Sequence, residues 1–141
     1  MENAWNMVAV TDADTGEYFG IGLLTASLDD PHLLVLNNGL LFIGADSFAI
    51  AFDIYTKQVK TLMPLPSEFV DFIYLENKKL VLIVHKKGVV AKDEDCNELW
   101  RSSQGYITGY TVDGDLFIME RANGGEVALK PKNGKEVELG R

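Results

Sequence analysis

Short apolar runs alternate with polar turns along the whole chain. The runs at residues 33–36, 40–44 and 80–84 read LLVL, LLFIG and LVLIV, and runs this short between turns are typical of strands. The stretch at 65–80 is the best helix candidate, with Ser67 as an N-cap. Its many aromatic and β-branched residues favour a strand instead. The pattern therefore predicts an all-β chain.

Four segments share one order of an apolar run, a polar turn and a second strand. The apolar runs begin at Val8, Ala49, Val89 and Val127. The turns begin at Asp12, Asp53, Asp93 and Pro131, with spacings of 41, 40 and 38 residues. A repeat of about 40 residues is typical of folds that add one small sheet per repeat.

The three later copies have a hairpin before this shared segment. Asn38-Gly39 and Asp113-Gly114 are strong hairpin signals because both residue pairs tolerate the positive φ angles of a tight turn. The first copy lacks these two leading strands, since seven residues precede Val8. We expect one domain over 1–141 with antiparallel four-stranded units at about 32–63, 69–102 and 105–139, after a leading hairpin at 7–24.

The repeated segments carry a resemblance to a known family. An Asp ends the strand, Thr15-Gly16 forms the turn of the first copy, and Trp100 closes the second strand of the third. This order resembles the repeats of pyrroloquinoline-quinone-type (WD-like) β-propellers. Such propellers have four to eight blades, and this chain has about three and a half units. The resemblance implies a propeller-like or an open, sandwich-like stack, or a ring that a second copy completes. No cofactor is expected.

The charge balance narrows the choice of partner. Thirteen basic and 21 acidic residues give a formal net charge of −8. This field repels nucleic acid and anionic lipid and accelerates encounter with a basic protein. One cysteine excludes an internal disulfide, and the N-terminus lacks a basic secretory start. We therefore expect a cytoplasmic protein with a basic protein partner and no direct nucleic-acid or membrane contact.

Three candidate reactive sites fail on residue spacing or charge. The run TDADTGE has Gly16 at position 5 and Leu23 at position 12 of an EF-hand alignment, where glycine belongs at 6 and glutamate at 12. Cys96 follows three acids, which oppose the thiolate that a nucleophile needs. His32 and His85 are 53 residues apart, and we expect His85 at an exposed hairpin tip. The sequence predicts no metal site and no enzyme.

Acidic side chains gather at the repeated turns, and aromatic side chains follow them. Because aromatic residues dominate contact hot spots, Trp100, Tyr106 and Tyr110 are candidate anchors, with a core position for Trp100 as the alternative. The acidic candidates for partner binding are Asp12, Asp14, Glu17, Asp29, Asp30, Asp93, Glu94, Asp95 and Glu98.

Two functions from different classes fit these features. The first is a noncatalytic acidic protein-binding module, such as an immunity protein that blocks a basic toxin, for example a nuclease. The alternative is a self-assembling scaffold, a homodimer in which the leading hairpin of one copy pairs with an open edge of the other. A hydrolase that uses acidic pairs such as Asp113 and Asp115 is the remaining option.

Overall fold

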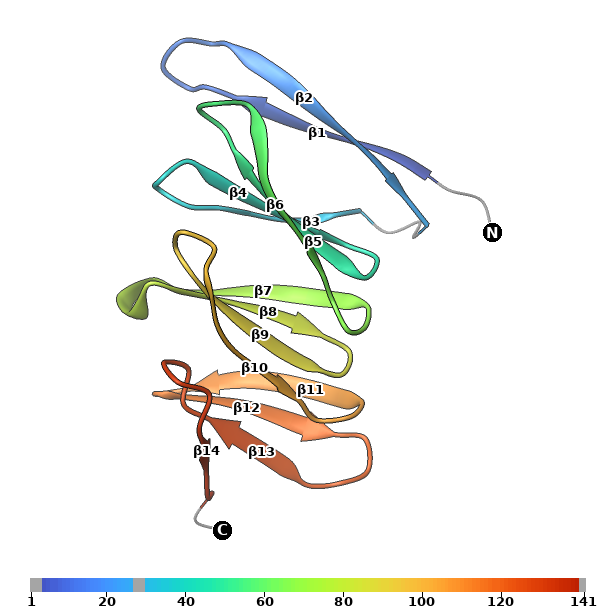
Figure 1. Cartoon of the computed structure of the whole chain (residues 1–141), viewed down its shortest axis with the longest axis vertical. Helices are drawn as coiled ribbons and strands as arrows, with labels where there is room; N and C mark the ends of the chain where they lie inside the picture. Colours follow the sequence, from blue (N-terminus) through green and yellow to red (C-terminus); the bar gives the residue numbers. More distant parts are fainter. Residues whose placement is uncertain (1–3, 27–29, 140–141) are drawn as a thin grey trace.

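A computed structural model describes residues 4–26 and 30–139 (Figure 1). Its strands form four antiparallel sheets. The hairpin sheet has β1 (Ala4–Thr11) and β2 (Tyr18–Thr25). The second sheet has β3 (His32–Val35), β4 (Leu40–Ala45), β5 (Phe48–Asp53) and β6 (Gln58–Pro64). The third has β7 (Phe69–Leu75), β8 (Leu80–His85), β9 (Gly88–Asp93) and β10 (Glu98–Ser103). The fourth has β11 (Ile107–Asp113), β12 (Leu116–Arg121), β13 (Glu126–Leu129) and β14 (Glu136–Val137).

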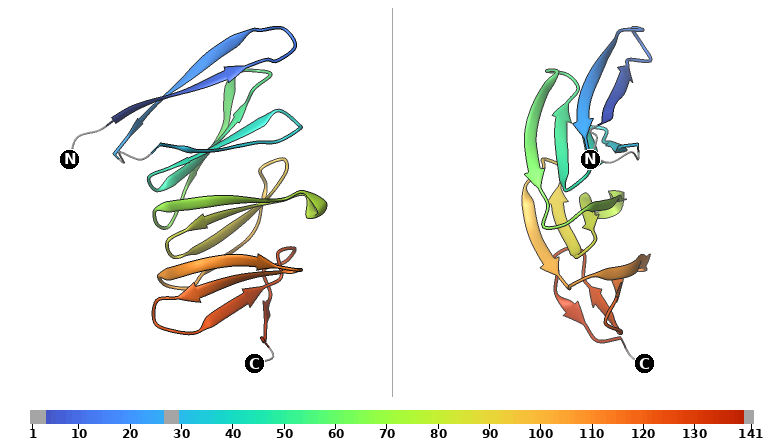
Figure 2. Two further views of the ribbon diagram at one scale, coloured as in Figure 1. Left: turned by 180° about the vertical axis from the view of Figure 1, so that it is seen from behind. Right: turned by 90° about the vertical axis from the view of Figure 1, so that its right-hand side faces the viewer.

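The sheets follow one another in chain order and stack face to face in a curved arc (Figures 1 and 2). The hairpin sheet lies at one end and the fourth sheet at the other, so the stack is open. In every sheet each strand pairs with its neighbour in sequence. The all-β fold and its four-stranded repeat are thereby confirmed, and the segment at 69–75 is a strand followed by a single 3-10 turn, Glu76–Lys78.

The core consists of three apolar layers, one between each pair of adjacent sheets. The packing of β4 explains why its sequence does not alternate between apolar and polar residues. Leu41 and Ile43 pack against the hairpin sheet, while Leu40 and Phe42 pack toward the third sheet. A strand covered on both faces needs apolar residues at every position. β8 is buried along its whole length in the same way.

Backbone hydrogen bonds hold successive sheets at a repeated spacing. Where the chain enters the third sheet, the N–H of Phe69 donates to the carbonyl of Asp46 at 2.6 Å. Where it enters the fourth, the N–H of Ile107 donates to the carbonyl of Lys86 at 2.9 Å. Asp46 and Lys86 occupy the same turn of consecutive sheets. Each connection is therefore tied to the middle turn of the sheet that it leaves.

The prediction that His85 lies at an exposed hairpin tip is wrong. Its side chain ends β8 and is only 1% exposed, because the connection between the second and third sheets covers it. The N–H of Lys87 donates to Ser67 Oγ at 2.9 Å and to His85 Nδ1 at 3.2 Å, so the Ser67 hydroxyl donates to Nδ1 at 2.7 Å. Burial, with a smaller contribution from Arg101, lowers the pKa of His85 to about 4.

This environment predicts a pH-dependent stability with a defined direction. The unfolded chain binds a proton at His85 near pH 6.5 and the folded chain only near pH 4. Stability is therefore present above pH 6.5 and is lost as the pH falls toward 4, by on the order of 2–3 kcal/mol. In urea unfolding, His85→Gln should flatten this slope relative to wild type. An equal slope in the two proteins would contradict the assignment.

Candidate functional site

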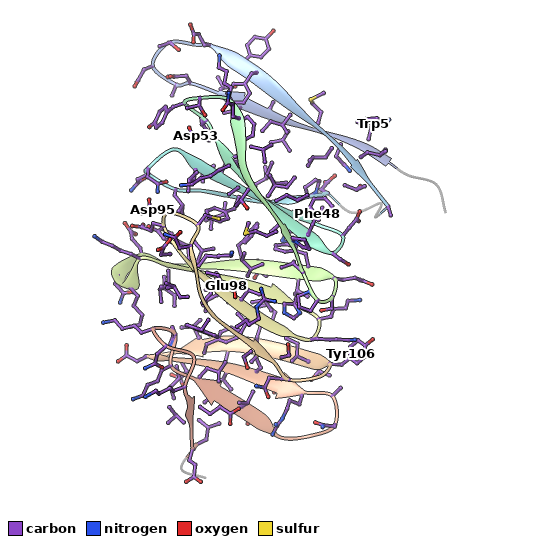
Figure 3. The ribbon with its side chains drawn as sticks, in the orientation of Figure 1. Trp5, Phe48, Asp53, Asp95, Glu98 and Tyr106 are labelled. Atoms are coloured by element: carbon purple, nitrogen blue, oxygen red, sulfur yellow. The ribbon has the colours of Figure 1, made fainter. Side chains whose placement is uncertain are left out.

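The four repeated turns lie along one side of the stack (Figures 1 and 3), where Asp53 and Asp95 are labelled. In three of them the first residue is an aspartate whose carboxylate folds the turn. Asp12 Oδ1 accepts the N–H groups of Asp14 and Thr15 at 2.8 and 3.2 Å. Asp53 and Asp93 each accept two N–H groups of their own turns at 2.9–3.1 Å. These three aspartates are turn-forming residues.

Two details of the turns differ from expectation. The fourth turn begins at Lys130, whose N–H donates to the carbonyl of Lys135 just as Asp12 donates to Glu17, so Pro131 is one residue late. Aligning the third turn with the first by their aspartates places Asn97 opposite Gly16, yet the positive φ angle of the third turn, 70°, belongs to Cys96. That turn is one residue shorter than the first, where Gly16 has a φ of 75°. A pattern of residue types does not reveal such a deletion.

Most acids of the third turn have partners within the chain. Burial raises the pKa of Asp93, but hydrogen bonds from Asn97 and from the N–H of Asp95 more than offset it and leave the pKa lowered. Glu94 accepts a hydrogen bond from Tyr74, which raises the pKa of Tyr74 to about 12. Glu98 accepts two hydrogen bonds from Arg101, at 3.0 and 2.5 Å, and they lower the pKa of Glu98.

The acids that point to solvent without a partner are fewer than the sequence indicates. Among the described residues, the carboxylates of Asp95, Asp14 and Glu17 are exposed and make no hydrogen bond or ion pair. Asp30 is exposed in the connection to β3, and Asp29 lies outside the described residues. At the fourth turn the charge reverses, with Lys130, Lys132 and Lys135 exposed there. Among the four repeated turns, the unpaired acids therefore belong to the first and the third.

The three aromatic candidates have different surroundings. Trp100 is half-buried against the core of the third and fourth sheets, and its Nε1 donates to the carbonyl of Pro131 at 2.7 Å. Tyr110 donates to Asp71 at 2.8 Å across the same two sheets, and burial together with Asp71 raises its pKa to about 12. Tyr106 is 59% exposed, with the Lys87 ammonium 4.9 Å from its ring centre. Only Tyr106 is presented as a surface anchor.

An exposed apolar surface lies at the end of the stack that the hairpin sheet forms, here called the open end. The sequence predicted only acidic site residues there. On the outer face of the hairpin sheet, Trp5 is 76% exposed, Met7 73% and Leu24 49%, and Trp5 pairs directly with Leu24. Figure 3 labels Trp5 at this end. Leu33 and Val35 of β3 are also about half exposed. Exposed apolar side chains gathered in this way mark interaction surfaces.

A groove of about 530 Å³ lies between the hairpin sheet and the second sheet. One wall is β1, through the consecutive residues Val8 to Thr11, and another contains Leu33 and Val35. Asp12, Glu17 and Lys57 line its polar end. The sequence did contain a signal for this site, because the first repeat lacks two strands. The periodicity did not show which side chains are left uncovered because these two strands are missing.

The described residues offer little for catalysis by metal or thiol. They contain no group of three or more His, Cys, Asp or Glu side chains placed to hold a metal ion. Cys96 is buried with its Sγ 3.7 Å from Met63 Sδ, and burial raises its pKa, which keeps the thiol protonated. The same residues form no helix long and apolar enough to cross a membrane.

The two kinds of acid in the third turn predict different mutational effects. Asp93→Ala removes an acceptor of two backbone N–H groups and should lower the free energy of unfolding by about 1–2 kcal/mol. Asp95→Ala removes an exposed carboxylate without a partner and should change stability by less than about 0.5 kcal/mol. Urea unfolding measures both. Equal effects would show that the carboxylate of Asp93 does not hold the turn.

Comparison with known proteins supports the fold. No family model matches the chain, and no curated protein matches it. Among solved structures, the computationally designed Ika4 protein is similar with a TM-score of 0.59 and 18% identity, over 80% of this chain and 73% of that chain. Hsv2p of Kluyveromyces lactis aligns with a TM-score of 0.48 and 7% identity, over 91% of this chain and 55% of that chain. At these identities, the likeness to the designed protein concerns the fold alone.

Proposed function

We propose that this chain is a noncatalytic protein-binding module whose contact surface is the open end of the stack. The observation that carries the proposal is the exposure of Trp5, Met7, Leu33 and Val35 at that end. The third sheet, by contrast, packs against a neighbour on both of its faces. An apolar surface beside a groove offers the desolvated centre that protein interfaces need.

The charge around this surface favours a basic partner. Glu17 is exposed and lines the groove, Asp14 is exposed in the same turn, and the whole chain has a net charge of −8. An immunity protein that blocks a basic toxin such as a nuclease is one concrete form of this function. In that form the unpaired carboxylates Asp14, Glu17 and Asp95 face the basic cleft of the toxin, and charge complementarity speeds the encounter.

This function predicts a salt-sensitive complex with a basic protein. In pull-down from cells that express the chain, with affinity then measured on the purified partner, Asp14→Asn/Glu17→Gln should weaken binding about 3- to 30-fold and reduce its salt dependence. Glu136→Gln/Glu138→Gln, with the same charge change at the other end of the chain, is the matched control. Equal affinity of both double variants would contradict a contact surface at the open end.

Self-assembly is the alternative, and one observation favours it specifically. The outer face of the hairpin sheet, with Trp5, Met7 and Leu24, is a sheet face with no neighbour in the described chain. A second copy stacked on this face would cover it, as the second sheet covers the inner face.

This alternative predicts a concentration-dependent dimer. Light scattering after gel filtration at micromolar concentration should give twice the monomer mass for the wild type and the monomer mass for Trp5→Lys/Met7→Lys. Val59→Lys/Leu62→Lys changes two other exposed apolar residues, both on β6, and should leave the dimer intact. A wild type that is strictly monomeric rules this alternative out.

A further inference from the structure

The hairpin sheet has half the strands of the other sheets, and the missing half has a defined place. By turn position, β1 corresponds to β5, β9 and β13, which each pair with a strand on both sides. Within the described chain, β1 pairs with β2 alone. The vacant place beside β1 is the one that β4, β8 and β12 occupy in the other sheets.

The free edge of β1 has backbone groups directed toward this place. Asp12 donates its N–H to the carbonyl of Glu17, so this pair, which continues the β1–β2 register, is a hydrogen-bonded pair. Such pairs alternate along an antiparallel ladder. The backbone groups of Val10 and Val8 therefore face β2, while those of Ala9 and Thr11 face the open edge.

The surface of the second sheet below this edge also has exposed apolar side chains that a strand would cover. Leu33 and Val35 lie opposite Ile43 and Leu41, so they share the face of the second sheet that packs on the hairpin sheet. Their counterparts in the third sheet, Phe72 and Tyr74, pack against the second sheet. Leu33 and Val35 remain about half exposed because no strand beside β1 covers them.

We propose that this groove binds an extended strand of a partner protein, which pairs antiparallel with β1 and completes the hairpin sheet. The inference rests on the proposed function and names the part of the partner that is recognised. Strands in the corresponding place, such as β4 and β8, are six residues long and buried throughout, and His85 alone among their residues is polar. The hairpin sheet is covered on its inner face only, so the occupant is a strand of about this length with apolar side chains at the alternate positions that face the second sheet. It is held by backbone pairing and by pockets for these side chains.

The charge of the groove orients the occupant. In the third sheet, Leu80 begins β8 opposite Asp93, and Asp93 corresponds to Asp12. The first residues of the bound strand therefore lie beside Asp12 and Glu17, which line that end of the groove together with Lys57 and outnumber its positive charge. Basic residues immediately before the apolar run complement these carboxylates.

A second copy of this chain does not fit the same edge. Two β1 strands that pair antiparallel are related by a twofold axis perpendicular to the sheet, so both hairpin sheets present the same face to the same side. The second sheet of each copy would then occupy the space of β3 and β4 of the other. The edge therefore does not pair with the β1 strand of a second copy.

A peptide with the sequence of residues 78–87, KKLVLIVHKK, is a suitable probe because it contains β8 with lysines at both ends. Fluorescence anisotropy of the labelled peptide should show saturable binding to the full chain. Hydrogen–deuterium exchange should show slower exchange at Ala9 and Thr11 in the complex. The same peptide with Leu82→Pro and Ile83→Pro loses an N–H from each edge and should not bind.

Two variants of the protein test the geometry. Ala9→Pro removes an N–H that β2 does not use, which an edge strand tolerates, and it should weaken peptide binding at least about tenfold. Leu33→Lys/Val35→Lys changes two exposed side chains of the wall and should weaken it similarly. Val59→Lys/Leu62→Lys on β6 is the matched control and should bind as the wild type does.

Three outcomes overturn the inference: no binding of the peptide, equal binding by Ala9→Pro and wild type, or exchange protection of β1 that rises with protein concentration without peptide. The last would assign the edge to a second copy. If the peptide fails while Asp14→Asn/Glu17→Gln still weakens capture of a basic partner, the strand site is wrong and the proposed function stands. If both fail, the proposed function is wrong as well.

Discussion

Face-to-face burial of small sheets is the constraint on which this structure depends. A four-stranded sheet has two faces, and both are covered by neighbours in the third sheet and, except at β3, in the second. This explains why β4 is apolar at every position and β8 at every position before His85. It also explains why apolar side chains are exposed at the open end, since the hairpin sheet is covered on its inner face only.

The turns and connections serve the same constraint. The aspartates at the start of three turns satisfy backbone N–H groups where a strand reverses, and the connections are hydrogen-bonded to the turn of the preceding sheet. Together they set each sheet at the distance and angle at which the apolar layers meet. Acidic residues at the turns therefore have two origins, turn geometry for Asp12, Asp53 and Asp93, and surface charge for Asp14, Glu17 and Asp95.

The fold was predictable from sequence because it is encoded locally and repeated. Apolar runs, Asn38-Gly39 and Asp113-Gly114 each mark a strand or hairpin, and the repeat period joins them into sheets. The exposure of particular side chains was not predictable to the same degree. His85 is buried because the connection around Ser67 covers it, and Trp100 reaches the following sheet through Pro131. Both contacts join residues distant in sequence, and alternation along a strand contains no information about them.

The order of the sheets has a consequence for how the molecule opens. Because each sheet contacts only those before and after it, the free energy of the stack is close to a sum over adjacent pairs, as in repeat proteins. The hairpin sheet has two strands and one neighbour, so it is the unit that can separate with the least loss of buried surface. The end that presents the groove is thus also the end where local unfolding begins, and whatever covers the groove would raise the stability of the whole array from that end.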